Sequence, residues 1–522
     1  MDTWRRRLRV AIIHGSRLPL IPAVLRKASQ LATWEVGREL ARLPGVEAVY
    51  TRHSHPRSAT FAPGQSDLDL TLVLDDTAAQ DATAVRVCTD RLDAMSRVVC
   101  FVWPQDARLI SVRELAQIEA WPGAAEILSA PSGWIRIGGR EVRGTAQPVR
   151  IESDRVATHP EFNAWWSNVL QTHVMSPATS LGEGNLRLCF RVAVKSERHL
   201  QAARGSASVS DDAYLSDSTA LSLLAEDAEM ARLLGGLERN GFWARDGEDR
   251  KPRILHRCIA RAAKFYRELP IPQDAAWTTP AAERSPAISD AHRNELRDRL
   301  GREAALRSIA HSIIVYPTPH WTPREYQVDV ILQDDVAPDA FEDAIGAIRK
   351  SIGGRTFGVG ETHAQLTMIP RHAFEHPWYF LGTPFPFLHE HVAAFAETLF
   401  GSPPRIPTPP SRAERLRWCA QYFLFHRFTL HYRPGYSSKD CNFLQLAALR
   451  LFFEKEVVLT EASQILRAYR DAFGDPEHLA ELPFADALKF QSREYATVES
   501  LLRREEASAR KQLDSNLVIR QT

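Results

Sequence analysis

Alternating apolar and polar positions mark the clearest strand in the N-terminal part of the chain. The segment PGQSDLDLTLVLDD (63–76) carries leucine at every second position, at Leu68, Leu70, Leu72 and Leu74. Side chains of a strand alternate between its two faces, so Asp67, Asp69 and Thr71 share the face opposite the leucines. The pattern predicts a half-buried strand with two carboxylates at its start.

The segments around this strand alternate between helical and strand-like patterns. Helices are expected at 30–43 and 76–96, and further strands at 46–51, 97–103 and 107–112. The last two strands are expected to form a hairpin across a proline turn. Strands that alternate with helices in this way predict an N-terminal α/β unit.

Beyond Glu161 the apolar spacing becomes helical. Helical patterns cover 161–174, 185–200 and 218–242, and a segment rich in proline and alanine, 268–291, has the composition of a linker.

A mixed pattern follows this linker. Two strands, 312–317 and 326–335, precede a helical pattern at 339–354, which predicts a small α+β unit. A second proline-rich segment, 401–412, precedes a mostly helical C-terminal region.

The fold class expected from these patterns is a multidomain α/β + α protein. A chain of 522 residues is too long for one ordinary core and predicts about three or four units. The expected division is an N-terminal α/β domain with a mixed sheet, a helical domain, a small α+β domain and a helical C-terminal region. Their bounds are 1–150, 151–270, 290–400 and 412–522.

Composition is that of a folded protein without a strong overall field. Apolar residues make up 44% and charged residues 25% of the chain, and 65 Lys and Arg nearly cancel 64 Asp and Glu. Long nucleic acid is therefore not favoured as a partner, although a local basic groove is not excluded. The six cysteines form no CxxC pair, and no run reaches the length of a membrane span, so we expect a cytoplasmic protein without a membrane partner.

Two carboxylates side by side on one strand repel each other unless both are solvated or a cation lies between them. Oxygen ligands of this kind suit Mg²⁺ or Mn²⁺. Asp67 and Asp69 are therefore candidate metal ligands and catalytic residues.

The order helix, strand (46–51), loop and Asp67-Leu68-Asp69 resembles the DNA polymerase β-like nucleotidyltransferase superfamily, which includes the minimal and aminoglycoside nucleotidyltransferases. The resemblance covers about 30–115, and His53-Ser54 stands where the family has Gly-Ser. It implies a nucleotidyltransferase-like N-terminal domain that transfers a nucleoside monophosphate from an NTP to a hydroxyl with two divalent metal ions.

The resemblance also implies a third carboxylate and a phosphate-binding loop. Asp106 is the candidate third catalytic and metal-binding residue, and Glu114 is the alternative. Ser54 matches the family serine that donates to a phosphate oxygen, while Ser66 precedes the first aspartate. Further phosphate contacts are expected from Arg52, Arg57 and Ser58.

Other polar clusters have simpler interpretations. Asp75-Asp76 reads as a solvated strand end and Lys195 as a surface lysine. The aromatic segment 418–432 has the spacing of a buried helix. Four histidines lie within twenty residues and are expected to be packing or surface residues, at His372, His376, His389 and His391.

The function expected from these residues is a magnesium-dependent nucleotidyltransferase acting on a small molecule, a protein side chain or an RNA end. An alternative is a non-catalytic protein that keeps the fold and binds a protein partner through its accessory regions. A third is metal-dependent glycosyl transfer from a nucleotide sugar, which the short helix-strand-loop order before Asp67 disfavours.

Overall fold

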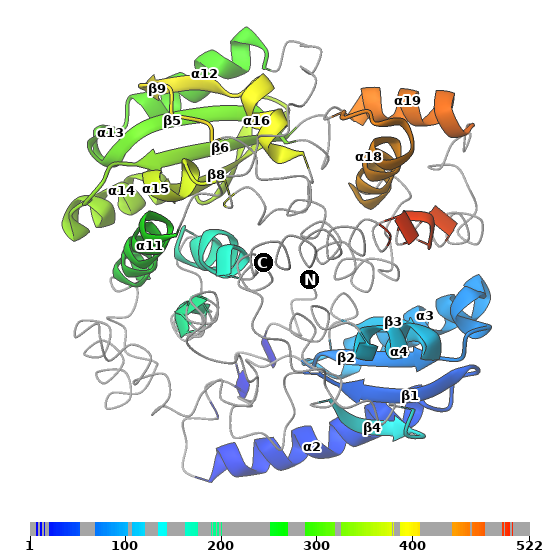
Figure 1. The fold of residues 1–522 in the computed structure, drawn as a ribbon. Helices are drawn as coiled ribbons and strands as arrows, with labels where there is room; N and C mark the ends of the chain where they lie inside the picture. Colours follow the sequence, from blue (N-terminus) through cyan, green and yellow to red (C-terminus); the bar gives the residue numbers. More distant parts are fainter. Residues whose placement is uncertain are drawn as a thin grey trace, which may run out of the picture.

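A computed structural model describes most of the regular elements of the chain and single residues between them. The continuous described ranges are 20–52, 68–102, 107–120, 134–142, 162–175, 251–269, 288–318, 325–377, 387–407, 441–459 and 462–474. In these ranges the protein combines mixed sheets with many helices, in accord with the expected α/β + α class. Figure 1 shows two separate sheets, one near the N-terminus and one in the second half of the chain.

The first sheet has four strands in the order β3-β2-β1-β4. The strands are β1 (Val46–Thr51), β2 (Leu70–Leu74), β3 (Arg108–Ser111) and β4 (Ile135–Gly139). Strand β1 is antiparallel to β2 and β4, whereas β2 and β3 run parallel. The strand predicted at 46–51 is confirmed with the same bounds, and the alternating leucines do form the next strand.

Helices connect these strands and lie on both faces of the sheet. They are α2 (Ile21–Leu40), the 3₁₀ turn η1 (Ala78–Gln80), α3 (Ala82–Val98) and α4 (Val112–Ala120). Helix α2 begins nine residues earlier than the pattern indicated, and Pro22 near its start suits a first helical turn. Helix α3 begins at Asp81, whose side chain accepts a hydrogen bond from the Thr83 amide at 2.9 Å.

The predicted hairpin between 97–103 and 107–112 is wrong. Helix α3 continues through Val98, and after it Val102 makes only an isolated parallel bridge with Leu68. Strand β3 then returns parallel to β2, with Thr71 opposite Arg108. A strand, a crossover helix and a parallel strand form a βαβ unit. The local sequence pattern predicts two adjacent antiparallel strands here instead.

Helix α2 lies very close to β4. A Cβ atom added to Gly138 would stand 2.1 Å from the carbonyl oxygen of Gly37, and one added to Gly37 would stand 2.3 Å from that of Ile137. Only glycine permits this approach of two backbones at both positions. The contact fixes which face of α2 turns toward the sheet.

The second sheet has five strands in the order β7-β8-β6-β5-β9. They are β5 (Ala310–Pro317), β6 (Glu325–Leu332), β7 (Thr356–Val359), β8 (Thr362–Pro370) and β9 (Glu397–Gly401). The predicted strand pair is confirmed as β5 and β6, which are antiparallel, and β8 adds to β6 in parallel. The sheet is larger than the pattern predicted because β7, β8 and β9 join the expected pair.

Helices surround the second sheet. They are the π-helical η4 (Ala164–Leu170), α7 (Gln171–Met175), α11 (Lys251–Glu268), α12 (Asp290–Gly301), α13 (Ala304–Ile309), α14 (Pro338–Ser351), α15 (Arg371–Phe374) and α16 (Leu388–Phe395). The helix expected at 339–354 is confirmed as α14. Two helices of the C-terminal region are α18 (Cys441–Lys455) and α19 (Ala462–Phe473).

One buried apolar cluster combines side chains from η4 through α19. It includes Trp166 of η4, Phe265 of α11, Val330 of β6, Phe341 of α14 and Phe452 of α18. Segments expected in three separate units thus contribute side chains to one core. Among the described residues, no helix is both long and apolar enough to cross a membrane.

Candidate functional site

Asp69 lies directly before β2, between strands on both sides. Its carbonyl oxygen accepts a hydrogen bond from the Arg52 amide at 2.9 Å. The preceding residue, Leu68, donates its amide to the carbonyl of Phe101 at 2.8 Å. Backbone contacts to both neighbouring segments therefore hold Asp69 at one end of the sheet.

The two faces of the sheet differ at β2. The even-numbered leucines, from Leu68 to Leu74, pack in a cluster with Val36 of α2 and with Leu92 of α3. Val73 belongs to a different cluster on the other face, with Tyr50, Ile110, Leu115 and Trp134.

Alternation along the strand places Asp69 and Thr71 on the same face as Val73. The leucines of β2 and Val73 lie on opposite faces as the pattern predicts, and the same alternation assigns Asp69 to the face away from α2 and α3.

Positive charge flanks Asp69 from β1. The Arg52 Nη2 atom lies 4.0 Å from the Asp69 Oδ1 atom, which is too long for a hydrogen bond but close for two opposite charges. The Arg52 side chain is 4% exposed and that of Asp69 is 27% exposed. The carboxylate therefore reaches water while its neighbouring guanidinium is held inside.

A second guanidinium comes from β3, which the sequence reading did not single out. Arg108 pairs with Thr71 in the parallel register. It alternates with Leu109 of the leucine cluster and therefore shares the face of Ile110, on which Asp69 also lies. The sequence feature that could have identified Arg108 is a charged residue at the start of an otherwise apolar strand.

Thr71 adds an unusual hydroxyl to this face. Its side chain is fully buried, and its Oγ1 atom has no hydrogen-bond partner within the described part of the chain. A buried hydroxyl without a partner is unfavourable, so a polar group that reaches Thr71 would relieve that cost. Thr71 stands two residues after Asp69, on the same face.

Most of the predicted site residues lie outside the described residues, namely Ser54, Arg57, Ser58, Ser66, Asp67 and Asp106. The described residues that bracket them are informative. Arg52 and Leu68 bound the loop 53–67, and Val102 and Ala107 bound 103–106. Arg52 and Leu68 adjoin Asp69, and Val102 bridges Leu68, so these described residues lie at the end of the sheet where Asp69 stands.

Glu114 does not lie with these residues, and its choice as the alternative third carboxylate is wrong. Its Oε2 atom accepts a hydrogen bond from the Ser111 amide at 2.7 Å, and its own amide donates to Ser111 Oγ at 3.0 Å. This reciprocal pair starts α4, as a Ser-x-x-Glu sequence can do. Ser111 is opposite Leu74 in the register, at the other end of β2 from Asp69.

Asp75 and Asp76 also serve local structure at that far end. Asp75 Oδ1 accepts from the amides of Thr77 at 2.9 Å and Ala78 at 2.8 Å. Asp76 Oδ1 accepts from the Arg113 amide at 3.0 Å. The two ends of one strand therefore differ, since the carboxylates at the far end are used in turns and helix starts.

The histidines near the second sheet have separate surroundings. His372 lies 3.1 Å from Asp334, whereas His391 contacts the carbonyl oxygen of Pro317 through Nε2 at 2.6 Å. Burial lowers the pKa of His376 to about 4, although a backbone hydrogen bond to Leu269 raises it slightly.

Across the ranges that the structure describes, no three His, Cys, Asp or Glu residues are grouped so as to hold a metal. Lys195 and the segment 418–432 lie outside those ranges.

Comparison of the chain with protein-family models, with curated proteins and with solved structures finds no match.

Proposed function

We propose that the chain is a magnesium-dependent nucleotidyltransferase that transfers a nucleoside monophosphate from an NTP to a hydroxyl group. Its N-terminal α/β domain would belong to the superfamily that the sequence resembles. The observation that carries the proposal is the position of Asp69, which is partly exposed at the end of a central strand and has a buried guanidinium 4.0 Å away.

The carboxylates expected to bind metal together with Asp69 would suit a hard divalent cation. Asp67 precedes Asp69 by two residues, and Asp106 directly precedes Ala107 at the return of the chain to the sheet. Carboxylate oxygens are the ligands that Mg²⁺ or Mn²⁺ prefers. Bound metal would supply charge neutralisation at the phosphates and lower the pKa of the attacking hydroxyl.

The arginines on the same face would bind the phosphates of the NTP. An NTP brings about four negative charges, and guanidinium groups bind phosphate oxygens through charge-assisted hydrogen bonds. Arg52 and Arg108 approach the face from β1 and β3, on both sides of Asp69. Ser54, Arg57, Ser58 and Ser66 belong to the loop that starts after Arg52 and would add further phosphate contacts.

Proton transfer from the acceptor requires a base close to the reacting oxygen. Asp106 is assigned this role because the third carboxylate of the family helps deprotonate the acceptor. Of the described residues around it, Val102 bridges Leu68 and Arg108 is opposite Thr71, so both lie within two residues of the level of Asp69. A carboxylate is a suitable base when it can reach the hydroxyl proton directly.

A labelling experiment tests this proposal. The full chain is incubated with each NTP carrying a label in the α-phosphate, with cell extract as a source of acceptors and with or without Mg²⁺. We expect one NTP to give a labelled product that requires Mg²⁺ and disappears in the Asp67→Asn, Asp69→Asn double variant. Equal labelling by the folded double variant would exclude these aspartates from catalysis.

A second candidate function has one observation in its favour. The Arg52 guanidinium already places positive charge near Asp69, and His53 occupies the position of the family glycine. In a non-catalytic protein of this fold, Arg52 would stabilise the ionised carboxylate without any metal. Absence of NTP binding in folded wild-type protein would favour this candidate.

A further inference from the structure

The face of α2 that points away from the first sheet carries large apolar side chains in contact with water. Val36 and Leu40 of the same helix are buried against the sheet. The opposite face exposes Val24 by 63%, Leu31 by 59% and Trp34 by 55%, and Leu20, directly before the helix, is 83% exposed.

Val24, Leu31 and Trp34 are separated by seven and three residues, which is the spacing of one stripe along a helix. A helix that is apolar on two opposite faces has a surface for a second packing partner. We call this exposed stripe the outer face of α2.

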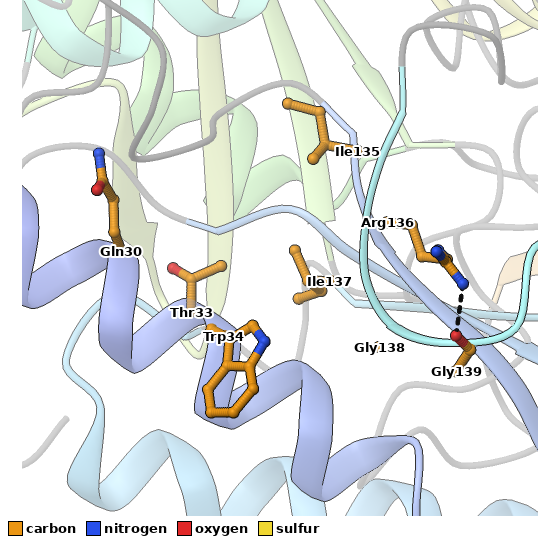
Figure 2. Close-up of a pocket in the computed structure, with 8 residues that line it drawn as sticks. All are labelled: Gln30, Thr33, Trp34, Ile135, Arg136, Ile137, Gly138 and Gly139. Carbon is orange, nitrogen blue, oxygen red and sulfur yellow. Dashed lines mark hydrogen bonds between the residues drawn. The ribbon is translucent and has the colours of Figure 1, made fainter.

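A hollow continues the outer face onto the sheet. It has a volume of about 290 Å³ and is lined in part by Gln30, Thr33 and Trp34 of α2 and by Ile135 and Ile137 of β4. Figure 2 shows the Trp34 ring on α2 and Ile135 on the strand beside it. Strand β4 is at the edge of the four-stranded sheet and Ile135 is 39% exposed, while Gln30, Thr33 and Arg136 add polar groups to the lining of the hollow.

The charges on the outer face favour a second copy of α2 as its partner. Lys27 is exposed and has no ion pair in the part of the chain that the structure describes, and Glu35 lies 2.5 Å from Arg38. Lys27 and Glu35 are each four residues from Leu31. Two copies of α2 that cross antiparallel at Leu31 therefore bring Lys27 of each copy opposite Glu35 of the other.

The parallel arrangement lacks this complementarity. It would place Lys27 against Lys27 and Arg38 against Arg38, and like charges across an interface oppose association. In the antiparallel arrangement Arg38 is opposite Val24 instead. The outer face is thus complementary to itself in one orientation.

We propose that the outer face of α2 is the interface of a homodimer, with the two helices antiparallel and Leu31 at the centre. The twenty residues of α2 span about 30 Å, long enough for a two-fold symmetric contact along the whole helix. The hollow beside Trp34 lies at the margin of this contact. The proposal does not depend on the chemistry at Asp69.

The first test is the mass of the full-length protein by sedimentation velocity over a range of concentrations. We expect a concentration-dependent dimer for the wild type, and a roughly hundredfold weaker dimer for Leu31→Glu, since this change places two charges at the centre of the interface. Val98→Glu is the matched control, because Val98 is 76% exposed on α3, outside the outer face. A monomeric wild type, or a Leu31→Glu variant that dimerises normally, would overturn the proposal.

Charge reversal tests the orientation. Lys27→Glu and Glu35→Lys should each weaken the dimer by roughly tenfold, because each variant creates two like-charge contacts. The double variant restores opposite charges and should regain most of the wild-type affinity. Failure of the double variant to recover would exclude the antiparallel arrangement even if a dimer forms. Circular dichroism of each variant checks that α2 and the rest of the fold are intact.

Discussion

Each of the two sheets carries an aspartate beside an arginine, and the surroundings of the two aspartates differ. Asp69 at the start of β2 has a side chain that is 27% exposed, with Arg52 4.0 Å away. Asp329 in the middle of β6 is only 2% exposed. Its Oδ2 atom accepts from the Tyr316 hydroxyl at 2.9 Å and its Oδ1 atom accepts from Gln327 Nε2 at 2.7 Å.

The hydrogen bonds around Asp329 continue into a closed network. Thr367, which is opposite Asp329 in the register, accepts from Gln327 at 2.9 Å and from Arg355 at 3.1 Å. Arg355 also donates to the Asn168 carbonyl of η4 at 2.6 Å. Burial raises the pKa of Asp329 to about 6 and lowers the pKa of Arg355 to about 10.

The comparison separates a structural aspartate from one that is available to a ligand. Both oxygens of Asp329 are used by neutral donors, and η4 lies over that face of the sheet through Arg355. Asp69 has a charged neighbour at a distance without a hydrogen bond and is open to water. We therefore expect changes at Asp329 to alter stability, and changes at Asp69 to alter binding.

The largest expected effect is that of Asp329→Ala. It leaves the Tyr316 hydroxyl and the Gln327 amide without their buried acceptor and removes the charge closest to balancing Arg355. We expect a loss of about 4 kcal/mol in the free energy of unfolding, measured by urea denaturation. Asp343→Ala, at an exposed position of α14, is the matched control and should change little. A loss below about 1 kcal/mol for Asp329→Ala would contradict the structural role.

The second prediction concerns pH. Burial raises the Asp329 pKa from 3.8 to about 6, so the folded state binds a proton more readily than the unfolded state between these values. The contribution of Asp329 to stability therefore rises as the pH falls through 6 and decreases again as the pH rises. Relative to Asp329→Asn, the wild type should gain up to about 3 kcal/mol between pH 7 and pH 4.

Urea denaturation of both proteins at several pH values measures this gain, and their difference cancels the other carboxylates. A difference that is constant with pH would show that Asp329 titrates normally.

A third prediction checks that the far end of β2 is structural. Glu114→Ala removes one half of the reciprocal hydrogen bonds with Ser111 at the start of α4. We expect a loss of about 1 kcal/mol in the free energy of unfolding without any change in NTP binding. Weaker metal-dependent NTP binding in this variant would show that Glu114 belongs to the nucleotide site.

The smallest expected effect on stability is that of Asp69→Asn. The side chain is partly exposed, and its pair with Arg52 is long, so the free energy of unfolding should change by less than about 0.5 kcal/mol. Urea denaturation beside Asp329→Ala makes the comparison direct. A loss of several kcal/mol in the free energy of unfolding would show that Asp69, like Asp329, stabilises the fold.

The sequence predicted the parts of this picture that depend on local pattern. The alternating leucines predict β2 and the assignment of Asp69 to the face opposite them, and the pattern at 46–51 predicts β1 with its observed bounds. The parallel return of β3 depends on a crossover, which no local pattern encodes, and Arg108 was missed with it.

Asp329 shows a second limit of local patterns. It occupies a polar position in the alternation of β6, which normally indicates a solvated face. It is buried because η4, more than 150 residues earlier in the chain, lies on that face through Arg355. The use of Glu114 in a helix start was visible as Ser111-Val112-Arg113-Glu114 and could have been predicted.

Calorimetric titration of the wild type, Asp69→Asn and Asp76→Asn with each NTP, in the presence and absence of Mg²⁺, tests the central claim most directly. Asp76 is the control because it lies just beyond the far end of β2, where it accepts a hydrogen bond from the Arg113 amide. We expect Mg²⁺-dependent binding of an NTP to the wild type and to Asp76→Asn, and its loss in a folded Asp69→Asn protein. Binding that Asp69→Asn retains in full, or that no protein shows with any NTP, would contradict a nucleotide site at Asp69.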